Sequence, residues 1–212
     1  MHKNAYRIIK IFNKLYPNPK PFLRYHSAFE LLVSVILSAQ CTDKRVNKVT
    51  PALFKAANTP QKILKLGKKG LIPYIHSCGF FNQKAKAILN ASKSIIEKFN
   101  GKIPKTIAEL TTIHGIGRKT AGVVISQAFH IPSFPVDTHV FRVSHRLGLS
   151  KAKTPDKTDY NLRRAFPKKQ WIPIHIQMIS HGRALCTARK PKCSVCPLLS
   201  ICPEGKRRVK IA

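Results

Sequence analysis

The chain has 212 residues, which is enough to bury a substantial core in one large domain or two small ones. Its 39 Lys and Arg residues against 8 Asp and Glu give a formal charge of +31, far more than solubility requires. We therefore expect a polyanionic partner, with nucleic acid as the first candidate. The charge is spread along the whole chain, which disfavours a membrane-surface binder that would gather it in one amphipathic helix or tail.

The first sixteen residues carry apolar side chains at helical spacing with lysines between them. This pattern predicts a helix that docks on the folded body, with an organelle transit peptide as the alternative. The longest apolar stretch, 28–39, is interrupted by polar residues and is too short to cross a bilayer. We therefore expect a soluble protein of the cytoplasm.

Helical periodicity continues through the chain without a convincing succession of alternating strands, so the sequence predicts an all-α fold. Prolines within 17–21 break the chain after the first helix. Helices are predicted over about 27–40, with Ser27 as N-cap, and over about 43–57, with Asp43 as N-cap.

A further apolar helical face begins at Phe81, and Asn100-Gly101 is a typical helix end. A short helix is expected after Pro104. The segment 131–135, which contains two prolines, interrupts the helical pattern a second time. Helical sequence then continues to a cysteine-rich loop. The basic residues of the tail, 206–210, are expected to fray into solvent.

The segment 113–121, I-H-G-I-G-R-K-T-A, predicts a tight hairpin between two helices, because glycines one residue apart permit a sharp turn. The free backbone N–H groups after Gly115 and Gly117 can hold a phosphate, and Arg118 and Lys119 add positive charge. A purely structural corner between helices is the alternative. The high positive charge of the chain favours a clamp on a nucleic-acid backbone.

Four cysteines near the C-terminus have the spacing C-x6-C-x2-C-x5-C. Four thiolates on one short loop can bind an iron-sulfur cluster or a single zinc ion. Zinc sites usually contain two C-x2-C pairs, whereas only Cys193 and Cys196 are so close here, which favours the cluster. Two disulfides are a weaker alternative, because Cys41 and Cys78 resemble reduced, partly buried core residues.

The hairpin G-I-G-R-K-T-A at 115–121, the V-D-T-H at 136–139, the L-S-A-Q-C-T-D at 37–43 and the cysteine loop occur together. In this combination they resemble the endonuclease III family of DNA glycosylases, which belongs to the helix-hairpin-helix superfamily. The resemblance extends from about Tyr6 to Cys202, nearly the whole chain.

The resemblance implies an all-α, two-domain helix-hairpin-helix glycosylase fold. A six-helix barrel is expected over 22–131, and an iron-sulfur domain over 1–21 and 132–212, with a 4Fe-4S cluster bound by Cys186, Cys193, Cys196 and Cys202. The implied partner is damaged double-stranded DNA, bound across the groove between the domains by a monomer, with the damaged nucleotide flipped out of the stack. A location at the nucleoid follows from that partner.

The resemblance also implies the chemistry. The neutral amine of Lys119 attacks C1′ of an oxidised pyrimidine nucleotide and expels the base, and β-elimination then breaks the strand on the 3′ side. Asp137 accepts a proton or stabilises the sugar cation. A helix N-cap is the alternative role for Asp137, and a phosphate contact is the alternative for Lys119. The implied DNA-binding residues are Gln40, Phe80, Gly115, Gly117, Arg118 and Thr120.

The chain follows the family pattern at Gln40 and departs from it at Phe80 and His114. Gln40 matches the residue that fills the gap left by the flipped base. Phe80 stands where the family more often has a leucine that wedges between bases, which leaves the opposite-base preference open. His114 replaces the proline usual before the first hairpin glycine. For Gln40 and Phe80, packing at a helix end is the alternative role, and His139 is assigned no role.

Two other functions compete with a glycosylase that is also a lyase for apurinic or apyrimidinic (AP) sites. A monofunctional adenine-from-mismatch glycosylase shares the hairpin and the cluster, but it generally lacks a lysine at the position of Lys119. A non-catalytic DNA-binding protein gives no reason for Lys119 and Asp137 to occur together.

Overall fold

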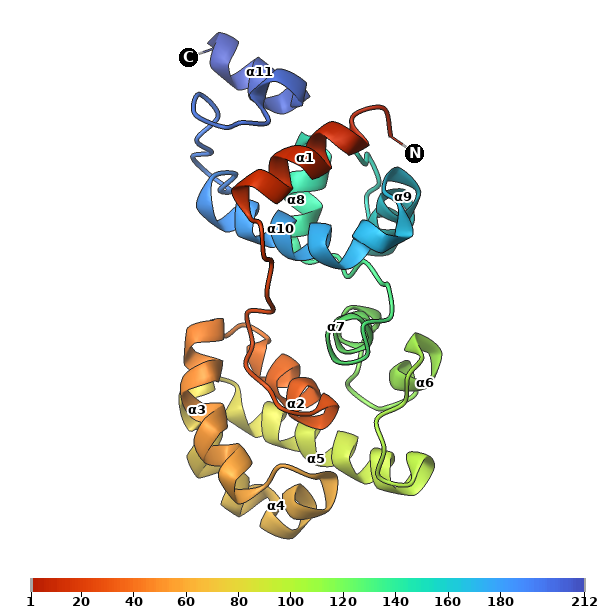
Figure 1. Ribbon diagram of the computed structural model, residues 1–212. Helices are drawn as coiled ribbons and strands as arrows, with labels where there is room; N and C mark the ends of the chain where they lie inside the picture. Colours follow the sequence, from red (N-terminus) through yellow and green to blue (C-terminus); the bar gives the residue numbers. More distant parts are fainter. Residues whose placement is uncertain (1, 212) are drawn as a thin grey trace. The chain divides into compact units, whose positions relative to one another are not determined.

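The computed structural model describes residues 2–211, with side chains for 2–210. Within these residues all regular structure is helical and there is no strand, which confirms the predicted all-α class (Figure 1). The helices of the described chain are too short or too polar to cross a membrane.

The chain divides into two compact units. Unit 2 is the continuous segment Pro21–Ile131, and unit 1 combines Met1–Lys20 with Pro132–Ala212.

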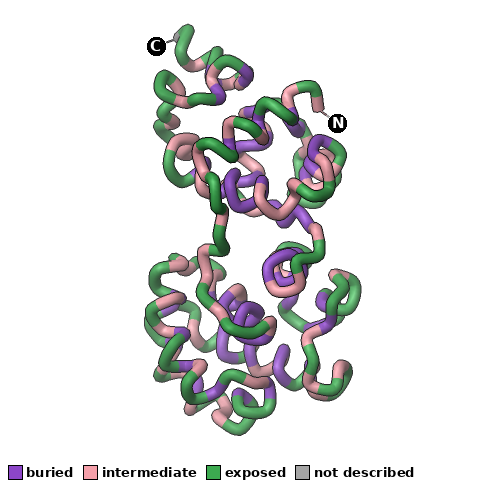
Figure 2. The backbone as a smooth tube through the Cα atoms, viewed as in Figure 1, coloured by how far each residue is buried: buried purple, intermediate pink, exposed green. Residues whose placement is uncertain are grey.

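Unit 2 holds six α-helices around one apolar core. Helix α2 is buried along most of its length and contacts α3, α5 and α7 (Figure 2). Its burial follows from its composition, because most of its residues are apolar on every face. The helices are α2 (Ala28–Ser38), α3 (Asp43–Ala56), α4 (Pro60–Ile75), α5 (Phe81–Phe99), α6 (Ile107–Thr111) and α7 (Arg118–Ala128), with the short 3-10 helix η1 (His76–Cys78) between α4 and α5.

Unit 1 packs the N-terminal helix against helices from the C-terminal part of the chain. Helix α1 lies on α10, and α10 packs on α8, which also contacts α9 and α11. The apolar face of α1 is buried, as predicted for a docking helix. The helices are α1 (Ala5–Leu15), α8 (Thr138–Arg146), α9 (Pro155–Ala165), α10 (Trp171–Ala184) and α11 (Pro203–Ile211), with 3-10 turns η2 (Lys168–Gln170) and η3 (Leu199–Ile201).

Side-chain caps fix most of the helix starts. Ser27 accepts a hydrogen bond from the Glu30 N–H, as predicted, and the Glu30 carboxylate accepts one in return from the His26 N–H. The cap of α3 was predicted to be Asp43, but it is Thr42, whose hydroxyl accepts from the Arg45 N–H. Threonine therefore takes the cap, and Asp43 lies in the first turn, where its charge favours the helix N-terminus.

The basic tail is helical, so the expectation that it frays was wrong. Pro203 starts α11 with a backbone angle already suited to a helix. Glu204 in the first turn then pairs with Arg207 and Arg208 one turn later. Hydrogen bonding from Arg207 lowers the pKa of Glu204. Contact with α8 adds tertiary support that the sequence pattern does not reveal.

Candidate functional site

The predicted hairpin joins α6 to α7 in unit 2. Ile113 and Ile116 are buried and hold it to the core, and the Ile116 N–H donates to the Ile113 carbonyl at 3.0 Å. Between them Gly115 has φ 87°, a left-handed conformation that favours glycine. The hairpin therefore forms as predicted, with its tip in solvent.

The start of α7 is open to an anion. Gly117 is its N-cap and offers no side chain to the N–H groups of the first turn, and a Cβ built on Gly117 would meet no atom within 4 Å. The first turn carries no acidic residue, and Arg118 and Lys119 are exposed there, followed by half-buried Thr120. Helix amides, helix dipole and two cations thus converge where a phosphate could bind.

Gln40 and Phe80 lie on two other exposed turns of unit 2. Both are non-glycine residues in the left-handed region, with φ of 50° and 47°, and Phe80 is 57% exposed. Such conformations are costly for these residues and occur preferentially at functional sites.

The two turns lie next to each other. Cys41 follows Gln40, and its thiol lies close enough to the thiol of Cys78, two residues before Phe80, to affect the pKa of that thiol. Burial, followed by the neighbouring Cys41 thiol, raises the pKa of Cys78 to about 11. The structure therefore brings the Gln40 and Phe80 turns together on the surface of unit 2.

Asp137 lies in unit 1, at the start of α8. It is the N-cap of that helix, and its Oδ1 accepts a hydrogen bond from the Val140 N–H at 2.7 Å. The residues before it, Phe134 to Val136, are buried and fix the approach of the chain. The carboxylate is half-buried. Asp137 therefore has the N-cap role that the sequence offered as the alternative. The same hydrogen bond holds its carboxylate in one orientation.

The four C-terminal cysteines line one largely apolar pocket in unit 1. Its other walls include Val143, Leu147, Leu198 and Leu199. All four are free thiols, each half-buried. Lys119 and the hairpin belong to unit 2, whereas Asp137 and these cysteines belong to unit 1.

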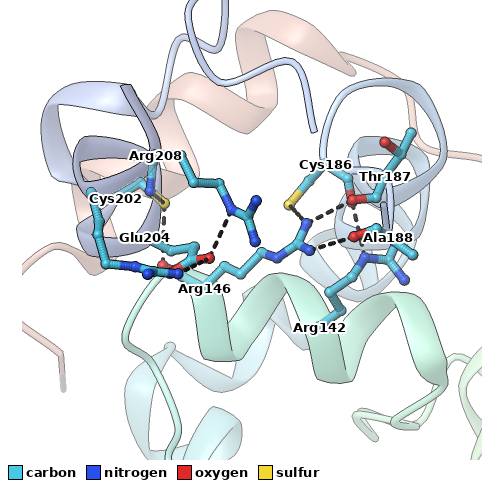
Figure 3. A network of polar contacts seen from close by, with 10 residues as sticks. Arg142, Arg146, Cys186, Thr187, Ala188, Cys202, Glu204 and Arg208 are labelled. Carbon is cyan, nitrogen blue, oxygen red and sulfur yellow. Dashed lines mark hydrogen bonds and ion pairs between the residues drawn. The ribbon is translucent and has the colours of Figure 1, made fainter. Parts of the chain in front are cut away.

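Two arginines of α8, which the sequence did not single out, anchor the start of the cysteine loop (Figure 3). Arg146 donates to the carbonyls of Thr187 and Ala188 at 2.7 and 2.8 Å and to the Cys186 sulfur at 3.4 Å. Arg142 donates to the carbonyls of Cys186 and Gly182 at 3.0 and 2.9 Å. No sequence signal separates these two arginines from the many other basic residues.

The other end of the loop is fixed by Cys202. Its thiol donates to the Arg146 carbonyl at 3.1 Å, and its sulfur accepts from the Gly205 N–H at 3.2 Å. Burial raises the pKa of the Cys202 and Cys196 thiols, whereas backbone hydrogen bonds act in the opposite direction. Because a metal binds the thiolate, loading of this pocket releases protons.

The donor set of the pocket fits an iron-sulfur cluster. In a cubane cluster each cysteine binds its own iron, so the sulfurs stand farther apart around a larger centre. Four thiols around an apolar pocket, with the Arg146 guanidinium at the Cys186 sulfur, fit that arrangement.

Comparisons with known proteins agree with these features. Residues 33–168 match the family model described as "HhH-GPD superfamily base excision DNA repair protein". Residues 186–202, from the first to the last cysteine of the loop, match "Iron-sulfur binding domain of endonuclease III". Endonuclease III of Rickettsia conorii is 46% identical, with 92% of this chain and 93% of the relative covered.

Two solved structures are similar over almost the whole chain. "Structure of a non-covalent Endonuclease III-DNA Complex" has a TM-score of 0.91 and 41% identity, covering 97% of this chain and 96% of that one. A trapped endonuclease III–DNA covalent intermediate has a TM-score of 0.90 and 41% identity, covering 96% of each chain. The cofactor is a 4Fe-4S cluster, which confirms the iron-sulfur cluster that the spacing favoured and the 4Fe-4S type that the resemblance implied. On the match of both family models and on this identity over nearly its full length, the chain belongs to the endonuclease III family.

Proposed function

We propose that the protein excises oxidised pyrimidines from double-stranded DNA and then cleaves the strand, as a DNA glycosylase with AP lyase activity. The observation that carries this proposal is the exposed Lys119 in the first turn of α7, directly after a hairpin shaped for a phosphate. Relatives of 41–46% identity named endonuclease III support it over a monofunctional or non-catalytic protein.

DNA binding begins with the backbone. The N–H groups at the start of α7 and the Arg118 and Thr120 side chains bind a phosphate without reading a base. Gly115 and Gly117 let the DNA backbone approach the turn closely. Gln40 fills the gap left by the flipped nucleotide, and Phe80 inserts next to it to stabilise the kinked stack.

Chemistry follows at the flipped nucleotide. The neutral Nζ of Lys119 attacks C1′, the bond from C1′ to the base breaks, and the base leaves with the bonding electrons and gains a proton. The sugar opens, and the amine and C1′ form a Schiff base. Loss of a proton from C2′ then expels the 3′ phosphate by β-elimination, and hydrolysis of the Schiff base frees Lys119.

Asp137 acts on the charges of the same step. We propose that its carboxylate faces the sugar, where it balances the positive charge that develops as the base leaves, or accepts a proton from the attacking amine. Its hydrogen bond from the Val140 N–H keeps the carboxylate from rotating. Preorganised negative charge of this kind needs no rearrangement during the reaction.

The cluster has a supporting part in this scheme. When bound to Cys186, Cys193, Cys196 and Cys202 it cross-links four points of one loop, which otherwise has little regular structure. The loop carries Arg189, Lys190 and Lys192, and these cations add to DNA affinity.

We also propose the domain division and the setting. The segment 22–131 forms the six-helix barrel domain, and 1–21 with 132–212 forms the iron-sulfur domain. The protein acts as a monomer on damaged duplex DNA, in the cytoplasm at the nucleoid.

A nicking assay tests the function. A duplex with one oxidised pyrimidine should be cut at the lesion, and an otherwise identical undamaged duplex should stay intact. Lys119→Gln should bind both duplexes and cut neither, whereas Lys153→Gln, which removes one charge elsewhere, should cut normally. Base release without strand cleavage by the unchanged protein would contradict the lyase assignment.

A further inference from the structure

The turn that carries Phe80 has an unusual backbone. Gly79 and Phe80 both have positive φ, 68° and 47°, and Phe80 is also the N-cap of α5 without any side-chain cap. A bulky side chain in the left-handed region is disfavoured unless surrounding contacts determine the conformation. Because Phe80 is 57% exposed, burial of its ring offsets only part of this cost in the free protein.

Lys84 brackets this turn from both sides. Its Nζ donates to the carbonyl of Cys78 at 2.8 Å, and its backbone N–H donates to the carbonyl of Phe80 at 3.0 Å. The turn, in which Phe80 is the residue strained by its positive φ, therefore lies between the side-chain bond from Lys84 and the first backbone bond of α5. Contact with the Cys78 carbonyl also caps the end of η1.

Packing does not explain a lysine at this position. Lys84 is only 5% exposed, so its ammonium group has lost most of its water. A methionine would fill a similar volume with a flexible apolar chain and without burying a charge. The charged donor is therefore best explained by the carbonyl that it holds, because hydrogen bonds from ionised donors are the stronger ones.

We infer that Lys84 is a positioning residue, which holds the Gly79–Phe80 turn so that the Phe80 ring stands ready to enter the base stack. This inference rests on the proposed function, since it needs a duplex with a base to displace. Without the Nζ contact the turn can relax toward ordinary backbone angles, and Phe80 then has to be reordered during each insertion. Base displacement becomes less favourable, whereas backbone phosphate binding at the hairpin is unaffected.

The test uses a lesion duplex with a fluorescent adenine analogue beside the damaged base, whose emission rises when the stack opens. For Lys84→Met we expect the equilibrium between stacked and opened duplex to shift by about tenfold toward stacked, as befits loss of one charge-assisted hydrogen bond. Affinity for undamaged duplex should stay within about twofold. Lys86→Met, an exposed lysine on the same helix, removes the same charge and should behave as the unchanged protein.

A double-mutant cycle separates positioning from general stability. In a Phe80→Ala background Lys84→Met should cause no further loss of opening, because the ring that it positions is gone. Full additivity of the two losses, or normal opening by Lys84→Met, would overturn the inference. If Lys84→Met does not fold, Lys84→Gln, which keeps a shorter donor, is measured in the same cycle and must show the same dependence on Phe80.

Failure of the proposed function would give a different result from failure of the inference on Lys84. The unchanged protein would then not cut the lesion duplex at all. Normal cutting by the unchanged protein, combined with opening that does not depend on Lys84, would reject only the role of Lys84.

Discussion

Replacing Arg146 by methionine should loosen the cysteine loop while leaving the hairpin intact. Methionine keeps most of the apolar stem of the arginine but loses the two donors that hold the carbonyls of Thr187 and Ala188. It also loses the contact with the Cys186 sulfur. The loop then retains Arg142 and Cys202 as its fixed points on α8.

The size of the effect follows from the exposure of each bond. The contact with Thr187 is partly buried, and a charged donor in that setting contributes about 1.5 kcal/mol or more. The contact with Ala188 is exposed, so solvent competes and it contributes about 0.5 kcal/mol. Together they predict a loss of about 2 kcal/mol in the free energy of unfolding of unit 1. With a typical urea dependence of about 2 kcal/mol per M, the midpoint falls by about 1 M.

The assay follows the visible absorbance of the cluster and the far-ultraviolet circular dichroism during urea titration. Arg164→Met is the matched control, because within the described residues Arg164 donates a hydrogen bond to exposed Tyr160 on its own helix and lies over its ring, and it should move the midpoint by less than about 0.3 M. A midpoint for Arg146→Met equal to that of the unchanged protein, with full cluster retention, would refute the anchoring role of Arg146.

Three further predictions test other parts of the account. The purified protein should be yellow-brown with about four irons per chain, and one zinc without iron after anaerobic purification would reject the cluster. Gly117→Val should fold normally, because φ of −82° suits any residue and the added side chain points into open space. It should nevertheless weaken binding to damaged and undamaged duplexes alike, by about tenfold, with a salt slope reduced by about 1; loss confined to the damaged duplex would contradict the phosphate clamp. Since burial raises the pKa of Cys78 from 9.0 to about 11, its contribution to stability is complete below pH 9 and disappears as the pH rises through about 11. Between pH 9 and about 11 the unchanged protein should therefore lose more free energy of unfolding than Cys78→Ser, as measured by urea titration. Parallel pH profiles of the two proteins would contradict this effect of Cys78.

Local chemistry accounts for the parts of the fold that the sequence predicted well. The hairpin needs only Gly115 between two buried isoleucines and a second glycine directly after them, and Ser27 needs only an N–H three residues later. The cysteine quartet is defined by spacing alone, because four thiolates on a short loop have few other stable arrangements.

Tertiary contacts account for what the sequence pattern left out. Helix α4 is hard to predict because Gly67, with φ of 64°, kinks it and Pro73 interrupts its last turn. Arg146 and Lys84 are two among 39 basic residues, and only the fold reveals that one holds a loop and the other is buried beneath a turn. The terminal helix α11 likewise depends on its contact with α8.

Covalent trapping of the reaction intermediate shows whether Lys119 is the nucleophile. In the presence of borohydride, which reduces a Schiff base to a stable amine, the unchanged protein should become joined to the lesion-containing strand, and peptide mapping should place the bond on Lys119. Asp137→Asn should still bind the duplex but trap more slowly by about 10² to 10³, because an amide cannot balance the developing sugar cation. Lys119→Gln should not trap at all. Trapping at another lysine, or trapping by Lys119→Gln at the rate of the unchanged protein, would contradict the account.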